Sequence, residues 1–167
     1  MRDGVSASRV RLPTGDWARL LDFLCHRFPA IGREEWVARI HKGHVLHEDG
    51  STVTLDEPHT PHEFIFYYRD VPHEATLPQD AQVLFEDEHV LVADKPHFLP
   101  VTPGGRFVRE TLLVRLKEQL GCADLSPLHR IDRETAGLVV LCKRAQDRNA
   151  YQGLFRQRQV HKVYQAV

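Results

Sequence analysis

The stretch Pro127–Leu141 reads PLHRIDRETAGLVVL and holds the most informative pattern in the chain. Asp132 stands between Arg130 and Arg133, and an apolar run begins at Gly137. Such a run is typical of a buried strand, and a glycine at its start allows another group to approach the backbone closely. We therefore expect a carboxylate flanked by two cations at the edge of a sheet.

This arrangement suits two kinds of role. Nearby cations favour the ionised form of a carboxylate, and an ionised carboxylate can act as a nucleophile or an electrostatic group toward a sugar or a base. The two arginines can bind phosphate. An exposed cluster of ion pairs would use the same residues, so the pattern alone leaves a catalytic and a structural interpretation open.

Outward from this stretch, residues 81–167 show the mixture of short apolar runs and amphipathic segments expected of an α+β fold. The runs predict strands and the segments predict helices. We expect these elements to form part of a mixed, mainly antiparallel sheet with flanking helices. The expected strands lie at 83–86, 89–93, 137–143 and 160–167, and the expected helices at 110–120 and 147–158.

The first half of the chain predicts a separate, smaller α/β module at residues 16–69. Asp16 is placed to cap a first helix, and apolar spacing predicts a second helix at 33–42. Asp49–Gly50 predicts a hairpin turn, and an aromatic-rich strand is expected at 63–69.

Two segments have the composition of connections rather than of packed structure. Residues 1–15 are polar and broken by Gly4, Pro13 and Gly15, which predicts a flexible N-terminus. Residues 70–80 contain two prolines and predict a linker. The N-terminus lacks the apolar core of a secretory signal, and no apolar run approaches the roughly 20 residues of a membrane span. We therefore expect a cytoplasmic protein that makes no membrane contact.

Charge is distributed unevenly along the chain. The formal net charge of −1 argues by itself against a nucleic-acid-binding protein. However, residues 101–167 contain 12 Lys and Arg against 6 Asp and Glu, whereas residues 51–100 contain 2 against 10. The last third therefore has the sign needed to meet phosphates, although a solvated basic face is the simpler interpretation.

The cysteines and histidines do not predict a disulfide framework or a metal site. The three cysteines form no CxxC pair, which predicts reduced thiols. His41, His44 and His47 have a regular spacing, but the end of a helix and the start of a strand are expected between them. Because no cysteine or carboxylate pattern completes a zinc site, we expect no metal.

Three motifs together resemble the RluA family of RNA pseudouridine synthases. Residues 129–143, HRIDRETAGLVVLCK, resemble the signature HRLDRxTSGLLLLAK, with Ala136 where the family usually has serine. Residues 83–96 resemble the family's opening hairpin, and Phe155 followed by 160–167 resembles its tyrosine-containing strand. The motifs occur in the family's order across 83–167.

The resemblance implies isomerisation of uridine to pseudouridine within a ribosomal or transfer RNA, without a metal or an organic cofactor. It implies that Asp132 is the catalytic nucleophile, that Arg130 wedges into the RNA stack, and that Tyr164 stacks on the flipped base. His129 and Arg133 are expected to contact the RNA or the base beside them. Extrusion of a base costs a few kcal/mol, and stacking on an aromatic side chain recovers about 1–3 kcal/mol.

Residues 16–69 resemble, more weakly, an S4-like RNA-binding module. Gly43–His44–Val45 and Asp49–Gly50 match the spacing of its turn and hairpin. The resemblance implies that cations of the two helices face RNA, namely Arg27, Arg33, Arg39 and Lys42. A small helical cap on the catalytic domain is the alternative.

Two alternatives to an active enzyme follow from the same motifs: a non-catalytic RNA-binding protein and an inactive fragment of the enzyme. The family continues past the tyrosine strand, with a basic residue that pairs with the aspartate, whereas this sequence stops inside that strand. We therefore expect a truncated chain that binds RNA weakly and with marked salt dependence, and that does not turn over. An unpaired strand at 160–167 also predicts self-association through its edge.

Overall fold

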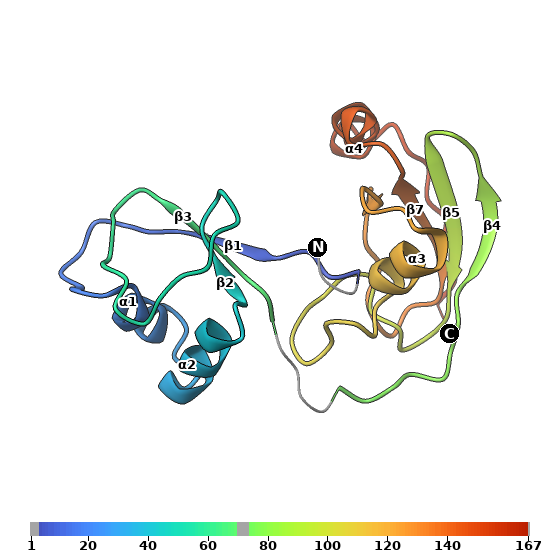
Figure 1. The fold of residues 1–167 in the computed structure, drawn as a ribbon. Coiled ribbons are helices and arrows are strands. Elements are labelled where there is room, and N and C mark those ends of the chain that lie inside the picture. The colour runs from blue at the N-terminus through green and yellow to red at the C-terminus, as the bar shows by residue number, and fades with distance from the viewer. Residues whose placement is uncertain (1–3, 70–73, 167) are drawn as a thin grey trace. The chain divides into compact units, whose positions relative to one another are not determined.

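The computed structural model describes residues 4–69 and 74–166 and divides the chain into two compact units (Figure 1). The N-terminal unit comprises residues 6–69, and the C-terminal unit comprises residues 4–5 together with 74–166. Within these described ranges, no helix combines the length and the apolar character that crossing a membrane requires.

The N-terminal unit packs two helices against one face of a three-stranded antiparallel sheet (Figure 1). Strand order is β1-β3-β2, and the core between helices and sheet includes Leu24, Trp36, Val45 and Ile65, all nearly inaccessible to solvent. The elements are β1 (Ser8–Arg11), α1 (Leu20–Arg27), α2 (Arg33–His41), β2 (Val45–Leu46) and β3 (Phe64–Tyr67).

Two expectations for this unit were wrong and one was confirmed. Within residues 1–15, the segment Ser8–Arg11 is not flexible but forms β1, which pairs with β3 more than 50 residues away in the sequence; residues 1–3 lie outside the described part. Helix α1 begins at Leu20 without a side-chain cap, so Asp16 is not its cap. The hairpin turn expected at Asp49–Gly50 is confirmed, since Gly50 adopts φ 86° and backbone hydrogen bonds join His47 to Ser51 and Val45 to Val53 across it.

The C-terminal unit is built on a four-stranded antiparallel sheet in the order β4-β5-β7-β6, which confirms the predicted mixed α+β fold. Helix α3 packs on one face, where Leu112 and Leu116 meet Leu91 and Val139. Gly121 ends this helix with φ 62°, a conformation that glycine adopts without strain. The elements are β4 (Gln82–Glu86), β5 (Val90–Lys95), α3 (Leu112–Leu120), β6 (Ser126–Pro127), β7 (Gly137–Cys142), the 3₁₀ turn η1 (Ala145–Asp147) and α4 (Arg148–Arg156).

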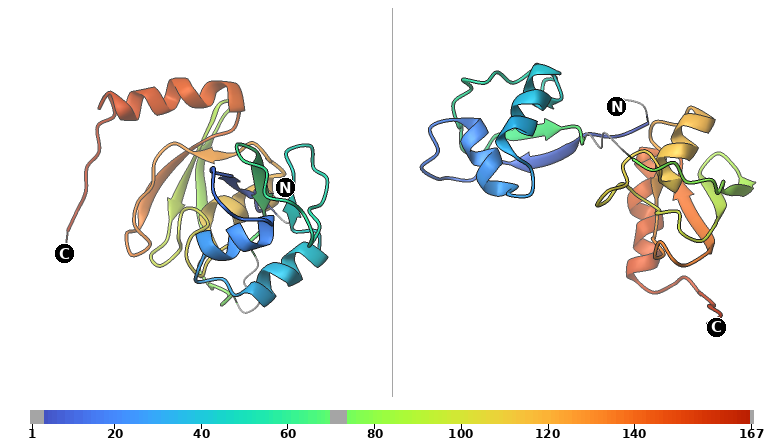
Figure 2. Two further views of the ribbon diagram at one scale, coloured as in Figure 1. Left: turned by 90° about the vertical axis from the view of Figure 1, so that its left-hand side faces the viewer. Right: turned by 90° about the horizontal axis from the view of Figure 1, so that it is seen from below.

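The expected strand at 160–167 is not formed in its described residues. Residues 161–166 pair with no described strand and are exposed, and Figure 2 shows this segment leaving α4 and running clear of the sheet in both views. Val167 lies outside the described part. A strand is stabilised by hydrogen bonds to a neighbour, and its own apolar pattern cannot replace them.

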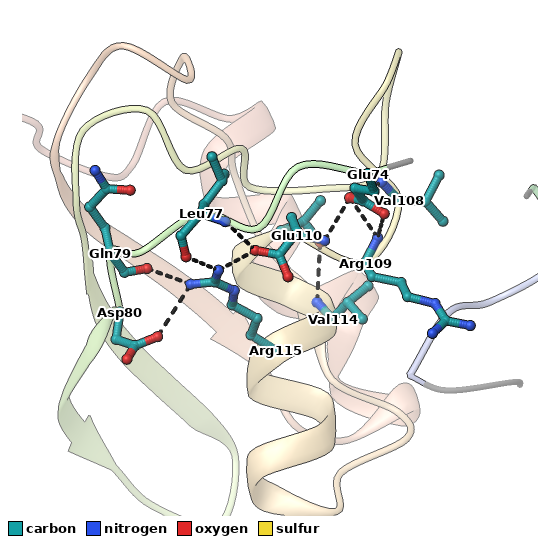
Figure 3. A network of polar contacts seen from close by, with 10 residues as sticks. Glu74, Leu77, Gln79, Asp80, Val108, Arg109, Glu110, Val114 and Arg115 are labelled. Carbon is teal, nitrogen blue, oxygen red and sulfur yellow. Dashed lines mark hydrogen bonds and ion pairs between the residues drawn. The ribbon is translucent and has the colours of Figure 1, made fainter. Parts of the chain in front are cut away.

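Residues 74–80, which the sequence predicted as linker, are bound firmly to the C-terminal unit (Figure 3). The carboxylate of Glu74 accepts hydrogen bonds from the backbone N–H groups of Val108, Arg109 and Glu110 at 2.7–3.0 Å. Arg115 on α3 donates to the backbone carbonyls of Leu77 and Gln79 and pairs with Glu110. The rest of the predicted linker, residues 70–73, lies outside the described part.

Candidate active site

Asp132 lies at an exposed position in the loop that joins β6 to β7. Its backbone carbonyl accepts a hydrogen bond from the Thr135 N–H at 3.1 Å, which closes a turn. No hydrogen bond or ion pair joins its carboxylate to any residue in 4–69 or 74–166. The loop therefore presents a carboxylate that is free to meet a substrate.

The backbone next to Asp132 is held by a buried cation, Lys95. This residue ends β5, pairs in register with Gly137 at the start of β7, and has no solvent exposure. Its Nζ donates to the carbonyls of Pro96 at 2.9 Å, Leu99 at 2.8 Å and Arg133 at 3.2 Å. Burial lowers the pKa of Lys95, and the charge of Glu134 opposes that effect. The three ammonium protons thus bind the turn after β5 to the loop that contains Asp132.

The turn after β5 supplies two further contacts to the same loop. The Phe98 N–H donates to the Arg133 carbonyl at 2.7 Å, and Nδ1 of His97 lies 2.6 Å from the Glu134 carbonyl oxygen. Phe98 adopts φ 68°, an uncommon conformation for a residue other than glycine. The loop is therefore fixed through its backbone at Arg133 and Glu134, while the side chain of Asp132 stays accessible.

His129 supports the loop from the other end. Its Nε2 accepts a hydrogen bond from the Val140 N–H at 3.1 Å, and its ring stacks on Phe155 of α4 with centroids 5.0 Å apart and planes 20° apart. Burial lowers the pKa of His129, and the positive charge of Lys162 lowers it further. The ring thus binds the backbone of β7 and packs on α4. The RNA contact expected of His129 stays a prediction.

The two arginines that flank Asp132 differ in their surroundings. Arg130 is exposed and has no ion pair or hydrogen-bond partner within the described ranges. Arg133 donates from Nε to Glu134 at 3.0 Å, and its guanidinium lies 5.7 Å from the centroid of the Phe107 ring. Only Arg130 is therefore left unpartnered for a phosphate or a base.

Tyr164 is not brought to Asp132 by the described part of the chain. The residue is 62% exposed, and within residues 4–69 and 74–166 its side chain has no hydrogen bond or ring contact. Among the residues around it, Lys162 has a ring contact, lying 6.0 Å from the Phe155 centroid. Among the described residues, no hydrogen bond or ring contact therefore joins the predicted tyrosine to the predicted aspartate or arginine.

No sequence pattern predicted the anchoring role of Lys95 and His97. The available signal was a lysine at the end of an apolar strand, directly before a proline. Its function could not be derived locally, since the carbonyl that it binds belongs to a residue 38 positions later. In the parts of the chain that the structure describes, no group of three or more His, Cys, Asp or Glu residues is arranged to hold a metal ion.

Comparison with known proteins gives a family for the region that contains this loop. Residues 89–167 match a protein family described as RNA pseudouridylate synthase. An uncharacterized RNA pseudouridine synthase of Synechocystis sp. is 36% identical over 148 residues, which is 89% of this chain and 50% of that protein. The ribosomal large subunit pseudouridine synthase D of Xylella fastidiosa is 32% identical, over 95% of this chain and 50% of that protein.

A yeast relative matches about half of the chain. The tRNA pseudouridine(31) synthase of Saccharomyces cerevisiae is 40% identical over 84 residues, which is 50% of this chain and 20% of that protein. The chain thus spans about half the length of the two bacterial relatives and a smaller share of the yeast one.

Proposed function

Residues 89–167 place the chain among the RNA pseudouridylate synthases of the RluA type, and from this premise we propose that the protein isomerises uridine to pseudouridine in RNA. In this reaction the bond between uracil N1 and the ribose breaks, and C5 of the same base bonds to that ribose carbon. C5 loses its hydrogen as a proton and N1 gains a proton, so the product is an isomer and no oxidant or reductant is consumed.

The observation that carries the proposal is the state of Asp132. Its carboxylate is exposed and unpartnered within the described ranges, while the adjoining backbone is bound by Lys95, His97 and Phe98. A purely structural ion-pair cluster would engage the carboxylate with the arginines beside it. A free carboxylate on a fixed backbone is instead what a nucleophile requires, since it must reach a substrate in one geometry.

Arg130 and Tyr164 complete the proposed reaction. Arg130 is exposed beside Asp132 and is suited to enter the RNA stack as the target uridine leaves it. We propose that Tyr164 stacks on the flipped base, which recovers about 1–3 kcal/mol of the few kcal/mol that extrusion costs. Since Tyr164 is exposed and unpacked here, this role requires its segment to take another position.

We propose structured ribosomal or transfer RNA as the substrate class, because two of the relatives named above are a ribosomal and a transfer RNA pseudouridine synthase. We also propose that the N-terminal unit helps to bind this RNA in the manner of an S4-like module, and that the protein acts in the cytoplasm. Self-association through residues 160–167 remains a prediction from sequence.

The test measures proton release from C5 of uracil. The protein is expressed from its complete coding sequence and incubated with ribosomal and transfer RNA labelled with tritium at uracil C5. We expect tritium release by the wild type and none detectable for Asp132→Asn, because the amide keeps the shape of the carboxylate but cannot act as its nucleophile. Binding of RNA to both proteins, measured by filter retention, should be nearly equal.

Asp124→Asn serves as the matched control, since Asp124 is an exposed carboxylate outside the loop. It should release tritium at the wild-type rate. Residual activity of Asp132→Asn within tenfold of the wild type would refute the assignment. Unchanged RNA binding with no release by the wild type would favour a non-catalytic RNA-binding protein instead.

A further inference from the structure

We propose that the solvent-facing side of the N-terminal sheet binds single-stranded RNA, with bases stacked over β3 and phosphates along β1. The proposal rests on the proposed function only in taking RNA as the partner. We call this surface the Arg–Phe face and define it by Arg9 and Arg11 on β1 and by Phe64 and Phe66 on β3.

Strand register puts these four side chains on one side of the sheet. Arg9 pairs with Phe66 and Arg11 pairs with Phe64, and paired residues of neighbouring strands point to the same side. The alternate residues, including Ile65 and Tyr67, point into the core against the helices. Phe64 and Phe66 are consequently left half-buried on the side opposite the core, and both arginines are exposed.

The local contacts already resemble those that bind a nucleobase. The guanidinium of Arg9 lies over the Phe64 ring, 4.6 Å from its centroid. Single-stranded RNA is bound by stacking of its bases on aromatic rings and on arginine planes, beside cations that meet the phosphates. Arg11 has no ion pair or hydrogen bond to any described residue, so its charge is available to a phosphate.

The distribution of charge indicates which strand would meet the phosphates and which would meet the bases. β1 is the edge strand of the sheet and contributes both cations. The carboxylates gather elsewhere: Glu48 and Asp49 follow β2, and with Glu63 they line a hollow that Phe64 also borders. Phosphates would be repelled from that hollow and attracted to β1, which leaves β3 to meet the bases.

The helices of the same unit are less suited to RNA than the sequence predicted. Arg39 is buried, pairs with Glu35 and lies over Trp36, so it does not face solvent. Arg33 pairs with Asp22 at 2.8 Å. Two of the four cations expected to meet RNA are therefore engaged within the unit, which favours the Arg–Phe face.

The experiment uses the full 167-residue chain and a fluorescein-labelled single-stranded 12-nucleotide RNA, with binding followed by fluorescence anisotropy. We expect Arg9→Ala combined with Arg11→Ala to weaken binding about tenfold, through loss of phosphate contacts. Phe64→Leu combined with Phe66→Leu should weaken it about fivefold, because leucine keeps the apolar bulk but offers no ring for stacking. Circular dichroism checks that each variant is folded.

The matched control is Arg19→Ala, which removes an exposed charge of the same unit that pairs with Asp56 at 2.9 Å and belongs neither to the Arg–Phe face nor to the two helices. It should change affinity less than twofold. Ultraviolet crosslinking of the same RNA carrying 5-iodouridine should label peptides that contain β1 or β3. Wild-type affinity in both sheet variants, or crosslinks confined to the helices or to the C-terminal unit, would overturn the proposal and point to a protein partner for this face.

The outcome is separable from that of the proposed function. Asp132→Asn should bind the short RNA like the wild type, since its change is limited to the C-terminal unit. If tritium release failed while binding still depended on the Arg–Phe face, the face would stand and the isomerase proposal would fall. If tritium were released and the sheet variants bound RNA normally, the isomerase proposal would stand and the proposal for the Arg–Phe face would fall.

Discussion

The loop that contains Asp132 and the segment that contains Tyr164 differ in how the rest of the C-terminal unit holds them. Lys95, His97 and Phe98 bind the backbone of the first at two consecutive residues. The second is exposed from residue 161 to 166 and has a ring contact through Lys162. Asp132 and Tyr164 thus both match motifs of the family, but only the backbone next to Asp132 is held in position by tertiary contacts.

The largest effect on how firmly the Asp132 loop is held is expected from Lys95→Met. This change removes the buried cation but keeps much of the side chain's length. The carbonyls of Pro96 and Leu99 lose their donor, whereas the Arg133 carbonyl keeps the Phe98 N–H. Each buried unsatisfied group costs about 1–3 kcal/mol, partly offset because no charge remains buried. We expect the free energy of unfolding to fall by about 2 kcal/mol in urea denaturation. Hydrogen exchange at the amides of residues 133–135 should also become faster.

The control for this variant is Lys143→Met. Lys143 pairs with Glu86 at 2.6 Å in a partly exposed position, where an ion pair contributes about 0–1 kcal/mol. If Lys95→Met were no more destabilising than Lys143→Met, and left exchange in the loop unchanged, then Lys95 would not anchor the loop.

A smaller effect should come from His129, through pH. Burial lowers the pKa of this residue below its unfolded value of about 6.5. As pH falls below that value, the unfolded chain takes up a proton that the folded protein resists, so stability decreases until the lower folded pKa is reached. Above pH of about 6.5 the effect is absent.

The measurement is urea denaturation of wild type and His129→Gln at pH 7.5 and 5.5. Glutamine can still accept from the Val140 N–H but does not titrate in this range, so the loss of stability on acidification should be smaller in the variant. His161→Gln, at an exposed position, should behave like the wild type. Equal losses in wild type and His129→Gln would show that the ring does not resist protonation.

The smallest effect on stability is expected from Tyr164→Ala. An exposed side chain without packing contacts changes the free energy of unfolding by less than about 0.5 kcal/mol. The same variant, made in the protein expressed from its complete coding sequence, should nevertheless slow tritium release from labelled RNA, because the flipped base loses its stacking partner. A destabilisation above about 1 kcal/mol would mean that Tyr164 is packed in solution, and would remove the contrast with the Asp132 loop.

Local sequence patterns were sufficient for most of the elements that position the site. The expected helix at 33–42 is α2, Arg33–His41, and the apolar run after Gly137 is β7. Gly43 and Gly121, which directly follow the helices expected at 33–42 and 110–120, both adopt positive φ. These features depend on apolar periodicity and turn-forming residues within one or two helical turns or within a single strand, so the sequence states them directly.

Tertiary structure alone decided the features that join distant residues. Ser8–Arg11 forms a strand because it pairs with β3, which lies far along the chain. The Arg39 side chain is buried because it pairs with Glu35 and lies over the Trp36 ring. Lys95 anchors the loop because its ammonium donates to the Arg133 carbonyl at 3.2 Å. Residues 161–166 carry a strand-like sequence but find no described partner. In each case the hydrogen bonds or ion pairs that stabilise the conformation come from outside the segment, and no local pattern can state whether they are supplied.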